Sequence, residues 1–150
     1  MSKGVTIHAQ TGHMNLSPVI FRNTARDFFK CYLDFKPQGK HISPVPYFLC
    51  CRAIEMAFKA IHLELNNRKF VRKEFGHDLI KSYKKLDKAH QNLTIDELNL
   101  LTKANNGYLG KDHTSKGFEY LPIFYLEPGS KYLPDRKALE KLARKITGYE

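Results

Sequence analysis

An arginine and a histidine stand five residues apart near the middle of this chain, as Arg72 and His77. A histidine ring can take up or return a proton at a ribose hydroxyl or a leaving oxygen, and a guanidinium can stabilise a charged phosphorane. Such a pair is able to cleave RNA without a metal ion. In a chain with 25 lysines and arginines and 7 histidines, the spacing also arises by chance. The alternative is that His77 only caps or packs at the start of a helix.

Basic residues are concentrated around this pair. Residues 66–90 contain eight of the 25 lysines and arginines and three acidic residues, and the whole chain has a formal net charge of +10. This concentration predicts a positive surface that attracts polyanions, or else simply the solvated face of a basic protein. The candidate residues for binding RNA or a nucleotide are Arg68, Lys69, Arg72, Lys73, His77, Lys81, Lys84, Lys85 and Lys88.

A second candidate site is a line of polar residues on an otherwise apolar run, residues 48–65. Its members recur at steps of three, four and three, so a helix places them on one side; they are Arg52, Glu55, Lys59 and His62. We expect this line mainly as the solvated edge of a buried helix, with Glu55 and Lys59 as an ion pair. The alternative is that it borders a cleft that faces the next helix.

The sequence gives little support for other chemistry. Cys50 and Cys51 are adjacent, so they point about 100° apart on a helix, and Cys31 lies in another segment. We therefore expect three buried, apolar cysteines and neither a zinc site nor a disulfide. Glycine-rich phosphate loops, dinucleotide-type glycine patterns, a glycine-flanked serine nucleophile and a His-Glu-x-x-His helix are absent from the sequence. We expect no metal and no cofactor.

Length and composition predict one domain. The 150 residues are 42% apolar and 12% aromatic, which is enough for a single hydrophobic core. We expect residues 1–16 to form a mobile arm and residues 17–150 a single helical domain. The apolar run at 48–65 is interrupted by charges, so we expect no membrane span. The N-terminus lacks the apolar core of a cleavable signal, so the expected compartment is the cytoplasm.

Five helices are predicted from capping residues and from apolar periodicity. The first begins at Ser17 and Pro18 and ends before Pro37, with these residues facing inward: Ile20, Thr24, Phe28, Cys31, Tyr32 and Phe35. The second follows Pro46 and ends before residues 66–67. The third opens near His77 and Asp78, and its inner face is Leu79, Tyr83, Leu86 and His90.

The last two helices have their own start signals. Thr94 and Glu97 form a capping box, so a fourth helix is expected to run to about Ala104 and to end at Asn105-Asn106-Gly107. Residues 118–126 are expected to be an irregular aromatic segment because Pro122 interrupts them. Asp135 caps a fifth helix, whose inner residues are Leu139, Leu142, Ala143 and Ile146. The predicted fold is an all-α antiparallel bundle of about five helices.

Two short strings in the chain resemble the HEPN domain, the higher eukaryote and prokaryote nucleotide-binding family. They are Ala53-Ile54-Glu55 with Phe58-Lys59-Ala60 on the buried helix, and Gly76-His77-Asp78-Leu79 at the start of the next one. The resemblance centres on residues 48–90 and implies a domain of about 17–146. It also implies an all-α bundle, often a homodimer. Many members are metal-independent RNases of toxin–antitoxin or defence systems, with an arginine and a histidine as the active pair.

The resemblance leaves three hypotheses for function. Arg72 and His77 match the spacing of the family's pair, but that pair usually lies in a later helix, and residues 89–135 contain no arginine. The first hypothesis is therefore a module without catalysis that binds RNA, a nucleotide or a partner protein through its basic surface. The second is a metal-independent endoribonuclease that uses Arg72 and His77. The third is a helical interaction scaffold without a polyanion ligand.

Overall fold

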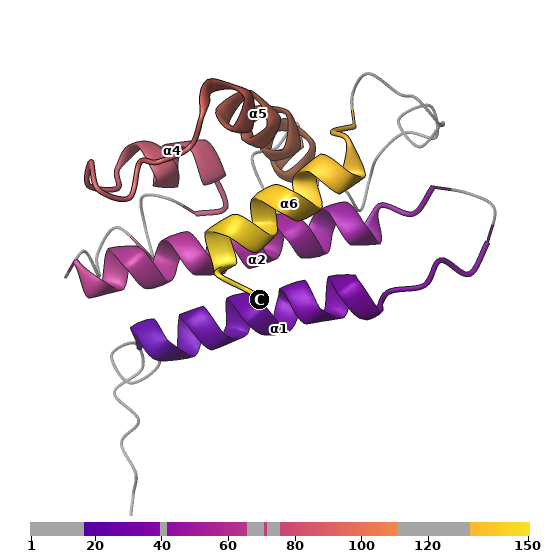
Figure 1. The fold of residues 1–150 in the computed structure, drawn as a ribbon, viewed down its shortest axis with the longest axis horizontal. Helices are drawn as coiled ribbons and strands as arrows, with labels where there is room; N and C mark the ends of the chain where they lie inside the picture. Colours follow the sequence, from indigo (N-terminus) through magenta and orange to yellow (C-terminus); the bar gives the residue numbers. More distant parts are fainter. Residues whose placement is uncertain (1–16, 40–41, 66–70, 72–75, 111–132) are drawn as a thin grey trace, which may run out of the picture.

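The computed structural model describes residues 17–39, 42–65, 71, 76–110 and 133–150 (Figure 1). Within these ranges the chain forms α-helices and no β-strand. The helices are α1 (Pro18–Asp34), α2 (Val45–Glu64), α4 (Leu79–Lys84), α5 (Ile95–Leu109) and α6 (Arg136–Thr147). The prediction of an all-α bundle of about five helices is confirmed. The predicted arm at 1–16 and the aromatic segment at 118–126 lie outside the described residues.

Helix α2 is the centre of the bundle. It runs antiparallel to α1 and beside it, α6 crosses over it, and α4 and α5 lie on the side away from α1 (Figure 1). Thirteen of its residues are buried, which agrees with a helix that is apolar on almost every side. An ion pair between Arg22 and Glu64 joins the start of α1 to the end of α2. The other four described helices all contact α2.

Helix α1 turns to the core a face that matches its periodicity only in part: the predicted Tyr32 is buried and Phe28 packs against the core, but other predicted positions are exposed. Phe29 and Tyr32 are buried in it, whereas Ile20 is 53% exposed and Cys31 is exposed. The rings of Phe29 and Tyr32 stack at 5.6 Å, and Tyr149 packs edge-on against Phe29 at 5.4 Å. The predicted inward positions of Ile20 and Cys31 are wrong, because α1 buries Ala25, Phe29 and Tyr32 instead, and a residue of the C-terminal segment packs on Phe29.

Helix α4 is held in place by a hydrogen-bonded clamp at its start. With six residues it is too short to be stable alone. The Asp78 carboxylate accepts a bond from the Lys81 backbone N–H at 3.0 Å, as an N-cap does. From α5, the Asn105 side chain accepts from the Leu79 N–H at 2.9 Å and donates to Asp78 at 3.1 Å. Helix α5 therefore fixes the position at which α4 begins.

Helix α5 is longer than expected. Its capping box between Thr94 and Glu97 is present as predicted, but the helix continues through Asn105-Asn106-Gly107 to Leu109. This sequence has a low helix propensity, which tertiary contacts override here. Asn105 is used in the clamp on α4, and the Tyr108 side chain is fully buried. The predicted end at Ala104 is wrong because packing, which the local sequence does not record, extends the helix by one turn.

Of the other predicted positions, the start of α6 is confirmed and the inward position of His90 is wrong. Helix α6 begins as predicted, with Asp135 accepting from the Ala138 N–H at 2.7 Å and with Leu139 and Leu142 buried. His90 does not belong to an inner face, because α4 ends before it and its exposed ring pairs with Asp87. Among the described helices, none is long and apolar enough to cross a membrane.

Candidate functional site

A carboxylate lies buried in the middle of α2. The Glu55 side chain is 3% exposed, and the Nη1 atom of Arg52 lies 3.2 and 3.1 Å from its two oxygens. The Lys59 ammonium also pairs with it. Removing such charges from water costs several kcal/mol per ion, which their mutual attraction must offset. The expected ion pair of Glu55 with Lys59 is confirmed. The expectation of a solvated edge is wrong, because Glu55 is buried and Arg52 and Lys59 are only partly exposed.

Two further side chains complete this group from other parts of the chain. The Nδ1 atom of His77, just before α4, lies 3.1 Å from both oxygens of Glu55. The Tyr108 hydroxyl, from α5, donates a hydrogen bond to the same carboxylate. The ring of His77 stands edge-on to that of Tyr108 at 6.2 Å and 84°. We call Arg52, Glu55, Lys59, His77 and Tyr108 the Glu55 cluster.

Local structure explains why these side chains meet. On α2, spacings of three and four residues place Arg52 and Lys59 on the same side as Glu55. On α5, Asn105 and Tyr108 are also three residues apart, so one face of the helix provides both the clamp on α4 and the hydroxyl. The clamp holds the residue directly before Asp78, which is His77, over the carboxylate. Packing of α4 and α5 on α2 therefore assembles the cluster.

The cluster holds more positive than negative charge. Burial alone would raise the pKa of the Glu55 carboxyl, but Lys59, the Tyr108 hydroxyl and Arg52 outweigh it and hold that pKa below its ordinary value of 4.5. Burial and the nearby carboxylate raise the pKa of Tyr108 strongly, so its hydroxyl remains a donor. Two cations thus surround one carboxylate. Arg52 and His77 keep side-chain exposures of 28% and 35%, so the positive edge reaches the surface.

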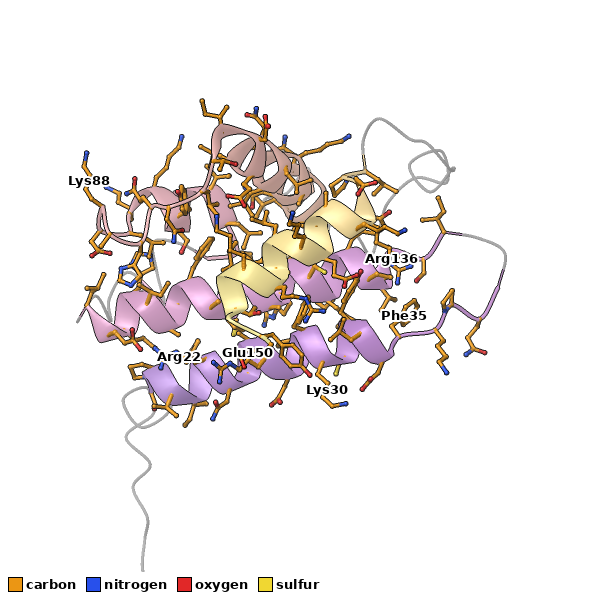
Figure 2. All side chains as sticks on the ribbon, in the orientation of Figure 1. Arg22, Lys30, Phe35, Lys88, Arg136 and Glu150 are labelled. Carbon is orange, nitrogen blue, oxygen red and sulfur yellow. The ribbon has the colours of Figure 1, made fainter. Side chains whose placement is uncertain are left out.

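Four exposed lysines follow His77 in the sequence. They carry exposed side chains on α4 and in the turn that follows, and Lys88 points away from the helices (Figure 2). The acidic residues of the segment are already engaged, Asp78 in the clamp and Asp87 with His90. The surface is therefore basic, and its lysines are Lys81, Lys84, Lys85 and Lys88.

The structure places only part of the predicted basic site. Four of its members lie outside the described residues: Arg68, Lys69, Arg72 and Lys73. The predicted pairing of Arg72 with His77 therefore stays a prediction, because Arg72 lies outside the described residues. Within the described part of the chain, the guanidinium of Arg52 lies beside His77, with Nη1 3.2 Å from Nδ1.

His62, the last member of the polar line, has a different role in the fold. Its side chain is fully buried, and its Nε2 atom lies 2.9 Å from the Ser82 carbonyl oxygen of α4. A carbonyl only accepts, so Nε2 carries a proton there. Burial lowers the pKa of His62 against the opposing effect of this hydrogen bond. His62 thus links α2 to α4 by a hydrogen bond.

Sequence reasoning missed Tyr108 as a member of the site. On a continuous helix, its spacing of three residues from Asn105 would have placed both side chains on one face. The sequence pattern predicted an end of this helix at about Ala104, so that face was not recognised. Among the described residues, no group of histidine, cysteine and acidic side chains is arranged to hold a metal ion.

Comparisons with known proteins do not name a family for this arrangement. No protein-family model matches the chain, and searches of curated proteins and of solved structures give no match.

Proposed function

We propose that this chain is a helical module that binds single-stranded RNA without cleaving it. The proposed surface consists of the exposed edge of the Glu55 cluster and the lysines around α4. The observation that carries the proposal is the position of His77, which contacts the buried carboxylate on one side and begins the segment with four exposed lysines on the other. Phosphates bound there would release counterions, and this release favours binding.

The cost of the Glu55 cluster supports a role beyond stability. Replacing a buried ion-paired group by well-packed apolar residues is often neutral or stabilising. Groups with perturbed titration at a partly exposed edge are common at binding and catalytic sites. Here the pKa of Glu55 is lowered and that of Tyr108 is raised, and Arg52 and His77 reach the surface.

The resemblance to HEPN domains is part of the proposal, including a homodimer. Its support is that the two strings behind the resemblance meet in space, because Glu55 belongs to one and His77 to the other. A dimer would place a second basic surface on the same RNA and strengthen binding by avidity. Sedimentation velocity measures this part directly, and a monomer at micromolar concentration would contradict it.

Charge reversal on matched lysines tests the RNA proposal. Lys84→Glu combined with Lys88→Glu should weaken binding of a fluorescent oligouridine on the order of tenfold in anisotropy titrations. The control is Lys137→Glu combined with Lys141→Glu, which makes the same change of charge at exposed positions of α6. Equal weakening by both pairs, or no binding at low salt, would reject the proposed surface. Binding of a mononucleotide alone, or of a protein, would support the other ligands over RNA.

A second candidate function, RNA cleavage, is favoured by one specific contact. The guanidinium of Arg52 lies beside the ring of His77, so this site has an arginine and a histidine even without Arg72. Cleavage in the presence of a chelator that is lost in His77→Ala would support it. Comparing the cleavage activities of Arg52→Lys and Arg72→Ala then shows which arginine provides the guanidinium that acts with His77. Retained cleavage in folded His77→Ala would exclude this active site.

A further inference from the structure

The contacts of His77 determine which of its ring nitrogens carries the proton. Nδ1 lies 3.1 Å from both oxygens of Glu55, whose pKa is held below its ordinary value. An unprotonated Nδ1 would turn its lone pair toward those of a carboxylate, which is repulsive. Nδ1 therefore donates to Glu55, and its approach to Arg52 is a contact between two donors. In the neutral ring, Nε2 is then the hydrogen-bond acceptor.

The accepting nitrogen lies at the surface. The His77 side chain is 35% exposed, whereas the carboxylate against its Nδ1 edge is 3% exposed. The exposed part is therefore the opposite edge, which carries Nε2. The described hydrogen bonds of this ring all involve Nδ1. A fixed acceptor thus stands at the start of the segment with the exposed lysines.

An acceptor beside a phosphate-binding surface has a natural donor in RNA. The ribose 2′-hydroxyl is both donor and acceptor, and it is the group by which proteins distinguish RNA from DNA. Bound to either nucleic acid, the lysines would contact phosphates that RNA and DNA share, so they would provide affinity without this distinction. We propose that Nε2 of His77, held in place by Glu55, accepts a hydrogen bond from a ribose 2′-hydroxyl and makes this chain prefer RNA to DNA.

This inference rests on the proposed RNA binding, and the experiment separates the two. Wild-type protein is titrated with oligouridine, its 2′-deoxy form and its 2′-fluoro form at about pH 8, above the range in which histidines ordinarily titrate. We expect RNA to bind roughly three- to tenfold more tightly than both analogues, as one hydrogen bond allows. Equal affinity for RNA and 2′-fluoro RNA would overturn the inference and leave the proposed function intact. No binding of any oligonucleotide would overturn both.

Substitution assigns the preference to one side chain. His77→Phe keeps a ring but lacks Nε2, so the ratio of the affinities for RNA and for the 2′-deoxy form should fall to about one, whatever the change in overall affinity. The matched control, His90→Phe, changes an exposed histidine in the turn after α4 and should keep the preference. A preference that survives in His77→Phe would refute the assignment.

One measurement needs no substitution. In the wild-type protein, imidazole nitrogen shifts from NMR should show the proton of the neutral His77 ring on Nδ1. A proton on Nε2 would contradict the proposal.

Discussion

The hydroxyl of Tyr108 on α5 donates a hydrogen bond to the carboxylate of Glu55 on α2, across 53 residues of sequence. Neither residue is solvated, since their exposures are 0% and 3%. The bond therefore provides the carboxylate with a donor that water does not supply, and it links the helix that clamps α4 to the centre of the bundle. The same hydrogen bond therefore belongs to the Glu55 cluster and to the packing of α5 on α2.

Removing this hydroxyl should destabilise the protein measurably. We expect Tyr108→Phe to lower the free energy of unfolding by about 2 kcal/mol, because a buried carboxylate loses a charge-assisted hydrogen bond. Urea denaturation measures the change. Tyr149→Phe is the control, since that ring packs against Phe29 at the half-exposed C-terminus, and it should change stability by less than about 0.5 kcal/mol. Equal losses would argue against the special role of Tyr108.

The Glu55 carboxyl should make stability depend on pH in the acid range. Its pKa in the folded chain is below 4.5, so the native state binds its proton less readily than the unfolded state does. Its stabilising contribution is therefore complete above the unfolded pKa and is lost as the pH falls through the folded one. Urea midpoints of wild-type protein should therefore fall as the pH is lowered from about 5 into the acid range.

Substitution of Glu55 separates this contribution from that of other carboxylates. Glu55→Gln should cost about 3 kcal/mol or more at neutral pH, because Arg52 and Lys59 remain without their counter-charge. The acid dependence of the variant should also be shallower than that of wild-type protein. The same acid dependence in both proteins would contradict the lowered pKa.

The clamp on α4 predicts a local effect. Asn105→Ala leaves the Leu79 N–H without its acceptor, so the amides of α4 should exchange with solvent faster, and global stability should fall by about 1–3 kcal/mol. Hydrogen exchange resolved by residue measures the first effect. Asn106→Ala is matched in residue type and helix but is exposed. If the Asn106 variant loosens α4 as much, the clamp is not what holds that helix.

The three cysteines should differ in reactivity. Burial raises the pKa of Cys50 to about 12 and that of Cys51 well above its ordinary value, whereas Cys31 is exposed. A thiol reagent such as Ellman's should therefore modify one cysteine rapidly in native protein, and all three after denaturation. Cys31→Ser should abolish the rapid phase. A rapid phase that remains in this variant would mean that α2 opens readily.

The sequence predicted the elements better than their environments. The capping box at Thr94 and the Asp135 cap involve neighbours in sequence, so their positions could be predicted without the fold. The spacing of Arg52, Glu55 and Lys59 likewise predicted a common side of α2. Whether that side meets solvent depends on where α4 and α5 pack, and local periodicity does not contain this information.

The same reason explains the missed residues. Asn105 and Tyr108 lie in and just after an Asn-Asn-Gly string that normally ends a helix, and their side chains make contacts with Asp78 and Glu55 in distant segments. The face of α1 was predicted only in part: Tyr32 is buried as expected, but Phe29, which Tyr149 from far along the chain contacts, was not among the predicted inner residues. Contacts between distant segments therefore determined what the sequence pattern left open.

The salt dependence of RNA binding tests the central claim most directly. For wild-type protein, the logarithm of the association constant for oligouridine should fall linearly with the logarithm of salt concentration. In Lys84→Ala combined with Lys88→Ala, this negative slope should become shallower by about 1.4. Each phosphate of a single strand that a lysine neutralises contributes roughly 0.7 to the magnitude of the slope, and the variant loses two such lysines. An unchanged slope in the folded double variant, or the absence of binding at low salt, would contradict the assignment of this surface to RNA.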